Sequence, residues 1–395
     1  MDYPKAVISD QGSTYIEQGQ MWMYRNNLVH LDETEDGDIV QIVREDGTFL
    51  ALGFVSLRSH IAVRILSHRQ EVIDDPFFAE RIRAAWEYRK TTQRENLGCI
   101  RLIYGEADGM PGLIADRYED LLVTQISCTG MEKRKDKIYA MIRNTLEEDG
   151  QHIRMIYERN DLEARTKEGL TKYQGIYSGE GSTQVIIQEN GLKLYVDVEN
   201  GQKTGYFLDQ KANRYLVRKL SYGKKVLDCF SHTGGFALNA ALGGASFVRA
   251  VDISQIALNQ AQANAELNGL EERMAFTKAD VFEYLDQIRL GDYDLIILDP
   301  PAFTKSRRTA DHAYQGYKRI NKKAMEVLRN GGYLATCSCS RYMEINMFEE
   351  MLKESAREAG VTLKQISVTQ QNSDHPILWN MTSSAYLKFY IFQIL

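Results

Sequence analysis

The feature that most constrains the fold is the alternation of short apolar runs with helical segments in the C-terminal half of the chain. Apolar runs that predict strands lie at residues 226–230, 247–252, 274–277, 293–298 and 333–336. Helical patterns lie at residues 236–242, 256–267, 317–329 and 348–359, and two more strand-like runs lie near 363–368 and 386–392. Strands that alternate with helices form a parallel sheet covered on both faces. We therefore predict a doubly wound α/β sheet from Leu192 onward.

The N-terminal half has a different pattern. Apolar segments at 39–43 and 61–66 alternate with Asp-Gly turns, which predicts a small β-barrel or sandwich. A helical pattern over 77–91 follows, with strand-like runs at 121–126 and 153–157, and this mixture predicts an α+β module. A chain of 395 residues with 44% hydrophobic content is long enough for two or three cores. The expected domains are a barrel over 1–72, an α+β domain over 73–190 and the doubly wound domain over 191–395.

Cysteine and charge content limit where the protein acts and what it binds. Five cysteines without paired spacing predict a reducing compartment, and no apolar run has the length of a membrane span. We therefore expect a cytoplasmic protein without a membrane partner.

The net charge of −6 argues against a generally basic coat for nucleic acid, but seven basic residues between Pro301 and Met325 accompany the single acid Asp311. They are Lys305, Arg307, Arg308, Lys318, Arg319, Lys322 and Lys323; a solvated helix face is the alternative interpretation.

Polar residues follow the predicted strands at the edge where sites of such sheets lie. Asp228, Asp252 and Asp299 close three strands. The loop 230–236 contains Gly234 and Gly235 but lacks a G-x-G-x-x-G phosphate cradle. Asp252 is placed to accept hydrogen bonds from two ribose hydroxyls, and with Asp280 after the third strand it favours an adenosine-bearing ligand. S-adenosylmethionine fits this pattern better than a dinucleotide, although the loop alone is also compatible with a structural turn.

Several motifs together carry a family resemblance. They are Gly205–Gln210, Asp228–Phe236, Asp299–Phe303 and Ser338–Ser340. In this order they resemble the class I S-adenosylmethionine-dependent methyltransferases of the bacterial large-subunit rRNA methyltransferase I family, which make 5-methylcytosine. The resemblance covers nearly the whole chain. Its N-terminal part, with Gly19–Tyr24, resembles the family's PUA domain, a β-barrel that binds RNA. One departure is that Lys5 is the only basic residue before Arg25, so this barrel is less basic than an RNA contact favours.

The resemblance implies a Rossmann-like methyltransferase domain, S-adenosylmethionine as cofactor and 23S rRNA as partner, with no metal. It implies that Cys339 and Asp299 are catalytic. The implied cofactor-binding residues are Phe207, Asp209, Asp228, Phe230, Ser231, His232, Thr233, Gly234, Gly235, Asp252, Ile253, Asp280, Val281 and Asp299. The implied substrate-binding residues are Pro300, Pro301, Phe303, Lys305 and Arg307. The oligomeric state stays open, with a homodimer as one alternative.

The proposed chemistry explains why a cysteine is required. C5 of cytosine is a poor nucleophile, and a thiolate that adds to C6 converts the ring to an enamine that can attack a methyl donor. Hydrogen bonding or protonation at N3 and N4 by Asp299, held by Pro300 and Pro301, stabilises that adduct. The base must leave its stack to be reached, and Phe303 is a candidate stacking partner with core packing as the alternative.

Two thiols compete for the nucleophile's role. The Ser-Cys-Ser motif favours Cys339, whereas the triplet Thr336-Cys337-Ser338 is similar to the nucleophile motif of another RNA 5-methylcytosine family. We expect the extended chain to send the two side chains to opposite faces, so that only one enters the site. Cys99, Cys128 and Cys229 lie in apolar runs and are expected to be structural.

Two other functions remain open at this point. One is methylation of an exocyclic amine of guanine or adenine, for which the Asp-Pro-Pro motif would suffice and the cysteines would be packing. The other is a non-catalytic RNA-binding factor in ribosome assembly. His232 could contact the cofactor's carboxylate, and Asp374-His375-Pro376 resembles a family motif that shapes the site; an incidental loop histidine and a simple turn are the alternatives.

Overall fold

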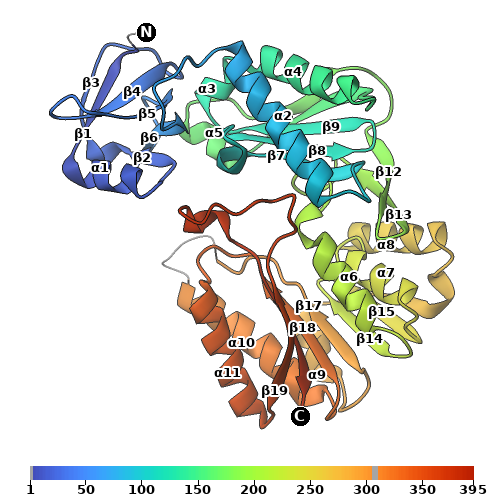
Figure 1. Ribbon diagram of the computed structural model, residues 1–395. Helices are drawn as coiled ribbons and strands as arrows, with labels where there is room; N and C mark the ends of the chain where they lie inside the picture. The colour runs from blue at the N-terminus through green and yellow to red at the C-terminus, as the bar shows by residue number, and fades with distance from the viewer. Residues whose placement is uncertain (1–2, 305–309) are drawn as a thin grey trace. The chain divides into compact units, whose positions relative to one another are not determined.

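The computed structural model describes residues 3–304 and 310–395 (Figure 1). The chain divides into two compact units, each built from several segments. Unit 1 comprises residues 1–187, 196–208 and 373–384, and unit 2 comprises residues 188–195, 209–372 and 385–395. The expected domain boundaries at 72/73 and 190/191 stay predictions.

The N-terminal part of unit 1 is a six-stranded sheet of order β2-β6-β5-β4-β1-β3. A helix, α1, follows the first strand and is N-capped by Ser9, whose hydroxyl accepts a hydrogen bond from Gly12 N. The alternating apolar residues of these strands form one core cluster that includes Ile8, Val40 and Ile65. The elements are β1 (Lys5–Ile8), α1 (Asp10–Glu17), β2 (Trp22–Tyr24), β3 (Leu28–Leu31), β4 (Ile39–Arg44), β5 (Phe49–Val55) and β6 (Ile61–Ser67).

The second sheet of unit 1 has five strands in the order β11-β10-β9-β8-β7. The predicted helix over 77–91 is α2, which begins at Asp75 because Asp74 caps it and Pro76 occupies its first turn. A large apolar cluster that includes Trp86 on α2 and Ile142 on α4 lies in this part of the unit. The elements are α2 (Asp75–Thr92), β7 (Cys99–Tyr104), β8 (Leu113–Tyr118), β9 (Leu121–Ile126), α3 (Thr129–Glu132), α4 (Lys135–Glu148), β10 (Met155–Asn160), α5 (Glu163–Lys167) and β11 (Tyr173–Ser178).

Residues 373–384 complete unit 1 late in the chain. Asp374 is buried; its Oδ2 accepts a hydrogen bond from the backbone N of Arg101 at 3.0 Å, and its carbonyl oxygen accepts one from Arg89 Nη2 at 2.9 Å. His375 is also buried, with Nδ1 2.8 Å from Asp374 Oδ1. The Asp-His-Pro motif therefore anchors this segment to α2 and β7.

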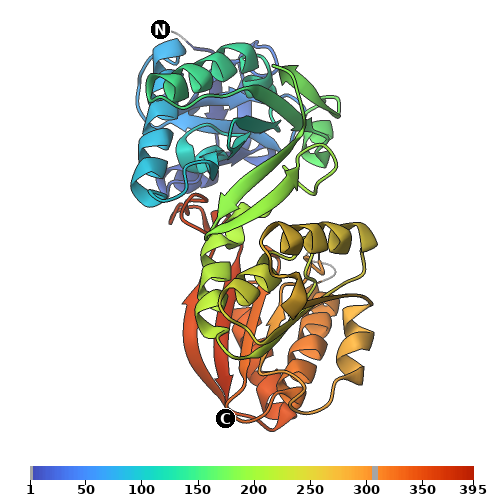
Figure 2. The same cartoon turned by 90° about the vertical axis from the view of Figure 1, so that its right-hand side faces the viewer.

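A hairpin of β12 (Gln184–Glu189) and β13 (Leu192–Asp197) forms a separate two-stranded sheet, whose strands run side by side in Figure 2. Asn190 and Gly191 join them, and both have positive φ, 52° and 79°, as a two-residue hairpin turn requires. The Asn-Gly dipeptide was available in the sequence as a signal for this hairpin. The expected domain boundary at 190/191 falls inside its turn.

Unit 2 contains the predicted doubly wound sheet, of order β16-β15-β14-β17-β18-β20-β19. β14 to β18 pair in parallel, whereas β20 pairs antiparallel with both β18 and β19. Helices cover both faces of the sheet (Figure 1). The elements are α6 (Lys211–Leu220), β14 (Lys225–Cys229), α7 (Gly235–Leu242), β15 (Phe247–Asp252), α8 (Gln255–Leu267), β16 (Met274–Lys278), α9 (Val281–Gln287), β17 (Leu295–Leu298), α10 (Ala310–Val327), β18 (Tyr333–Ser338), α11 (Ile345–Ala359), β19 (Leu363–Thr369) and β20 (Lys388–Ile394).

The helices of the described residues include none with both the length and the apolar character that a bilayer crossing needs.

Candidate functional site

The carboxyl ends of four neighbouring strands meet in unit 2. Cys229 at the end of β14 is paired with Val251 of β15 on one side and with Leu298 of β17 on the other, and Leu298 is paired with Thr336 of β18. This register brings the residues that follow or close the four strands to one edge of the sheet. Asp228, Asp252, Asp299 and the segment Cys337–Cys339 therefore gather as expected.

The loop after β14 adopts a strained path over this edge. Phe230 and His232 have positive φ values of 60° and 48°, and Gly234 has a φ of 82°. A Cβ atom on Gly234 would lie 3.0 Å from the Cβ of Ala261, so a side chain there would be both strained and crowded. The backbone N of His232 donates to Asp252 Oδ2 at 2.9 Å. The loop is thus fixed to the end of β15 through the main chain of His232.

Asp252 is oriented by two backbone donors. Its second oxygen, Oδ1, accepts a hydrogen bond from Ser254 N at 2.9 Å. Carboxylate oxygens can accept more than one hydrogen bond, so both still have capacity for a ligand hydroxyl. The side chain of Ile253, next to it, is 68% exposed, which is unusual for an isoleucine beside a candidate ligand site.

Asp280 and Val281 have local structural roles. The Asp280 carboxylate caps α9 by accepting from Phe282 N at 2.8 Å and Glu283 N at 3.3 Å. Val281 is buried as the first residue of that helix. Asp280 keeps an exposed carboxylate, whereas the Val281 side chain belongs to the core of unit 2.

Asp228 is a fully buried carboxylate with spare capacity. Its Oδ2 accepts a hydrogen bond from Ala237 N at 2.9 Å. Within the described part of the chain, Asp228 Oδ1 and the hydroxyl of Ser231 have no hydrogen-bond partner. Burial, and secondarily the charge of Asp299, raise the pKa of Asp228 well above the usual range. A buried acid of this kind is stabilised by a cationic ligand.

Asp299 forms a polar cluster with two residues from other elements. The thiol of Cys337 donates to Asp299 Oδ1 at 2.8 Å, and Gln210 Nε2 donates to the same oxygen at 3.1 Å. Burial raises the pKa of Asp299, which the hydrogen bond from Cys337 partly opposes. Pro300 is buried and Pro301 is exposed. Sequence reasoning did not assign a role to Gln210, although it is the last residue of the quoted Gly205–Gln210 motif.

The two candidate thiols differ in exposure. Cys337 lies in β18 with 0% exposure, and burial followed by the charge of Asp299 raises its pKa well above the usual range. Cys339 directly follows the strand and is partly exposed. The expectation of opposite faces does not hold, because side chains two positions apart share a face of a strand. The difference arises instead because β18 ends at Ser338.

Comparison with known proteins identifies the family. A family model described as S-adenosylmethionine-dependent methyltransferase matches residues 166–393, and one described as PUA-like domain matches residues 7–68. The ribosomal RNA large subunit methyltransferase I of Aeromonas hydrophila is 43% identical over 375 residues, 93% of each chain. That of Klebsiella pneumoniae is 36% identical over 393 residues, 98% of this chain and 97% of the other. The chain belongs to the ribosomal RNA large subunit methyltransferase I family.

Solved structures share the fold of this methyltransferase. A candidate SAM-dependent methyltransferase from Streptococcus mutans has a TM-score of 0.83 and 22% identity, with all of both chains covered. A second structure, SMU.776 complexed with SAH, has a TM-score of 0.84, 22% identity and the same coverage. The predicted class I methyltransferase fold with an N-terminal PUA-like domain is confirmed.

S-adenosylmethionine is the cofactor of this methyltransferase, and the polar edge of unit 2 fits it. Asp228, Asp252 and Asp299 place three carboxyl groups at the edge that carries the loop 230–235, and the positive sulfonium and ammonium groups of the ligand would favour the ionised forms of the buried Asp228 and Asp299. Among the described residues Asp228 Oδ1 has no hydrogen-bond partner, and at Gly234 the main chain carries no side chain; both features are compatible with a bound cofactor. Asp209, also buried in unit 2, accepts a hydrogen bond from Tyr386 OH at 2.7 Å through Oδ2.

Phe207 belongs to unit 1 of this methyltransferase. Lys203 Nζ lies 4.5 Å from the centroid of the Phe207 ring.

Phe303 packs in an aromatic cluster. Its ring centroid lies 4.6 Å from that of Tyr317, 5.8 Å from that of Phe282 and 6.3 Å from that of Phe230. These contacts favour the packing interpretation of Phe303 over stacking on a substrate base.

The basic segment after Pro301 is only partly described. Lys305, Arg307 and Arg308 lie outside the described residues. On α10, Lys318 pairs with Glu354 and Glu358 at 3.0 and 2.7 Å, Arg319 pairs with Asp286 at 3.1 Å, and Lys322 pairs with Glu358 at 3.4 Å. These three side chains form ion pairs within the protein, so their positive charges do not require a phosphate partner.

Proposed function

We propose that this methyltransferase methylates C5 of a cytosine in 23S rRNA through a covalent bond between Cys339 and C6 of the base. One observation carries the proposal: Cys339 is the only one of the five cysteines that is not buried. It directly follows β18, and Asp299 directly follows the neighbouring strand β17. A nucleophile must reach its substrate, and a thiol at the open edge of the sheet can do so.

The residues of the edge would act in sequence on the base. The Cys339 thiolate adds to C6, and the electron pair moves onto the ring. Asp299 stabilises that charge by a hydrogen bond or a proton at N3, for which its raised pKa is favourable. S-adenosylmethionine supplies the electrophilic methyl group. Loss of the C5 proton and departure of the Cys339 thiolate restore the aromatic ring.

The cofactor would be held by Asp228, Asp252 and the loop 230–235, with Ile253 beside its base. The names of the relatives support ribosomal RNA of the large subunit as the substrate. Ribosomes are present in the cytoplasm, which supports that compartment as the place of action. Homodimer formation stays a prediction.

The substrate assignment is tested by mapping methylation in the organism that carries this chain. We expect that deletion of its gene removes one 5-methylcytosine from 23S rRNA, as measured by mass spectrometry of nuclease fragments. Re-expression of the chain should restore the mark. Loss of a methylated exocyclic amine would favour the alternative chemistry, and unchanged rRNA would favour a non-catalytic assembly role.

The assignment of Asp252 is tested by cofactor binding. We expect Asp252→Ala to weaken S-adenosylmethionine binding by about 1 to 3 kcal/mol, the range for a hydrogen bond to a charged group. Titration calorimetry measures the change. Asp74→Ala is a matched control, because it removes an exposed helix-capping carboxylate of the same size from α2 in unit 1, outside the proposed cofactor site. Equal affinities of the Asp252→Ala variant and the unaltered protein would remove Asp252 from the ribose site.

A further inference from the structure

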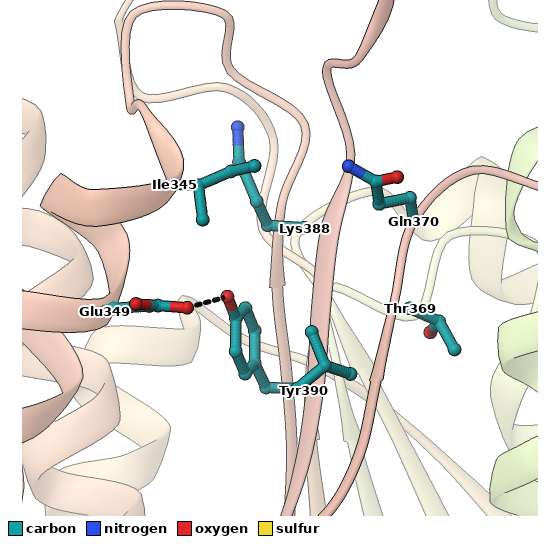
Figure 3. Close-up of a pocket in the computed structure, with 7 residues that line it drawn as sticks. Ile345, Glu349, Thr369, Gln370, Lys388 and Tyr390 are labelled. Atoms are coloured by element: carbon teal, nitrogen blue, oxygen red, sulfur yellow. Dashed lines mark hydrogen bonds between the residues drawn. The ribbon is translucent and has the colours of Figure 1, made fainter. Parts of the chain in front are cut away.

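Lys388 is a buried lysine at the start of a mainly apolar strand. Its strand, β20, pairs antiparallel with β18, and the register places Lys388 opposite Ser338, next to Cys339 in the chain. The Lys388 residue is only 4% exposed. Figure 3 shows its side chain extending beside Ile345 in a pocket that Glu349 and Tyr390 also line. Lysine is rarely buried unless it is paired, so this position requires an explanation.

The ammonium group is held by main-chain oxygens. Lys388 Nζ donates to the carbonyl oxygen of Ser340 at 2.6 Å and to that of Tyr386 at 2.9 Å. These two carbonyl oxygens accept two of its three N–H bonds but do not neutralise its charge. In the part of the chain that the structure describes, no carboxylate forms an ion pair with Lys388. The pocket's own acid, Glu349, accepts a hydrogen bond from Tyr390 OH at 2.7 Å instead (Figure 3).

Two thiols on the neighbouring strand and just after it act electrostatically on Lys388. Burial lowers the pKa of Lys388 to about 8, and the negative charges that oppose this shift are those of Cys339 first and Cys337 second. Ser340, which receives the hydrogen bond, directly follows Cys339, and adjacent Cα atoms lie about 3.8 Å apart. The buried cation on β20 is therefore bonded to the residue that directly follows the partly exposed thiol.

We propose that Lys388 is a positioning residue for the nucleophile, which fixes the turn after β18 through the Ser340 carbonyl and stabilises the thiolate of Cys339 by its positive charge. The proposal rests on the proposed function of Cys339. The thiol proton goes to solvent when the thiolate forms. Lys388 would thus raise the fraction of Cys339 that is ready to attack, without contact with the base.

Other titratable groups surround the same segment and must be considered in a pH experiment. They are Asp299 after β17, Tyr317 on α10, Cys337 on β18, Glu349 on α11 and Tyr390 on β20. Burial raises the pKa values of Tyr317, Tyr390 and Cys337. Arg341, two residues after Cys339, is a further cation, but it is exposed and its charge is screened by solvent, whereas Lys388 is buried. The removal of Lys388 should therefore disfavour the thiolate most.

The test is the pH dependence of Cys339 alkylation by iodoacetamide. The other four thiols are buried, so the labelled site is Cys339, and Cys339→Ser verifies this by mass spectrometry. We expect Lys388→Met, which keeps the aliphatic stem, to raise the midpoint pH of Cys339 alkylation by about one unit. This is the lower end of the pKa shift that one neighbouring opposite charge causes. Lys364→Met, at an exposed position of β19, should leave the midpoint unchanged.

A charge-preserving variant separates electrostatics from a structural tie. Lys388→Arg should keep the midpoint within a fraction of a unit, provided that calorimetry shows cofactor binding intact. An unshifted midpoint in Lys388→Met, or equal shifts in the Met and Arg variants, would overturn the proposal. These outcomes are independent of the proposed function, which fails if Cys339→Ser retains methylation.

Discussion

RNA that carries 5-fluorocytosine at the target position should become covalently attached to the protein through Cys339. Fluorine at C5 cannot leave as a proton does, so the adduct formed by the thiolate persists after methyl transfer. Denaturing electrophoresis detects the attachment, and peptide mass spectrometry locates it. Cys339→Ser should abolish both the adduct and methylation, because a serine hydroxyl is a far weaker nucleophile than a thiolate at neutral pH.

Cys337 provides the matched control for this experiment. Cys337→Ser should retain substantial activity, because the buried hydroxyl can still donate to Asp299 Oδ1 as the thiol does. Cofactor affinity should be similar in both serine variants. An adduct that persists in Cys339→Ser and disappears in Cys337→Ser would transfer the nucleophile to Cys337. An active Cys339→Ser enzyme that forms no adduct would support methylation of an exocyclic amine.

Replacement of Asp299 by asparagine should have the second-largest effect. The amide has nearly the same shape but cannot deliver a proton to N3 of the base. We expect the rate of adduct formation to fall by about 100- to 1,000-fold, the scale for loss of one group that stabilises charge in the transition state. The measurement is the time course of adduct formation on the 5-fluorocytosine RNA.

The interpretation of the Asp299 variant depends on an intact active-site edge. Gln210→Ala is a suitable companion, because it removes a neutral donor to the same carboxylate oxygen without removing the acid. It should slow the reaction by much less than Asp299→Asn. An Asp299→Asn enzyme within tenfold of the normal rate would exclude proton delivery by this residue.

The methyltransferase sheet could be predicted because most of its parallel strands are short apolar runs that alternate with helical patterns. The carboxyl-end residues followed from the same pattern, since parallel strands bring their ends to one edge. The helix α6 was not predicted. Its residues Asn213 and Arg214 are polar but buried, and Arg214 pairs with Glu189 at 2.6 Å. A local signal for the helix was present, because Ala212, Leu216 and Leu220 recur at helical spacing, but its ion pair with a residue 25 positions away could not be read from that pattern.

A role for Lys388 could not be predicted from the sequence for a related reason. Its contact with Ser340 depends on the antiparallel register of β18 and β20, which no local pattern reveals. A lysine inside the apolar run Leu387–Ile394 was nevertheless a visible anomaly. The roles of Asp252 and Cys339, in contrast, stay predictions that the geometry supports.

The late segment 373–384 bears on how the protein is made. Synthesis proceeds from the N-terminus, so α2 and β7 leave the ribosome almost three hundred residues before Asp374. Until then, the backbone N of Arg101 and one nitrogen of the fully buried Arg89 lack the partners that they have in the finished protein. Unit 1 can therefore reach its final stability only when the chain is nearly complete. A protein truncated before residue 373 lacks this segment of unit 1 and also β20 of unit 2, and should be a target for cellular proteases.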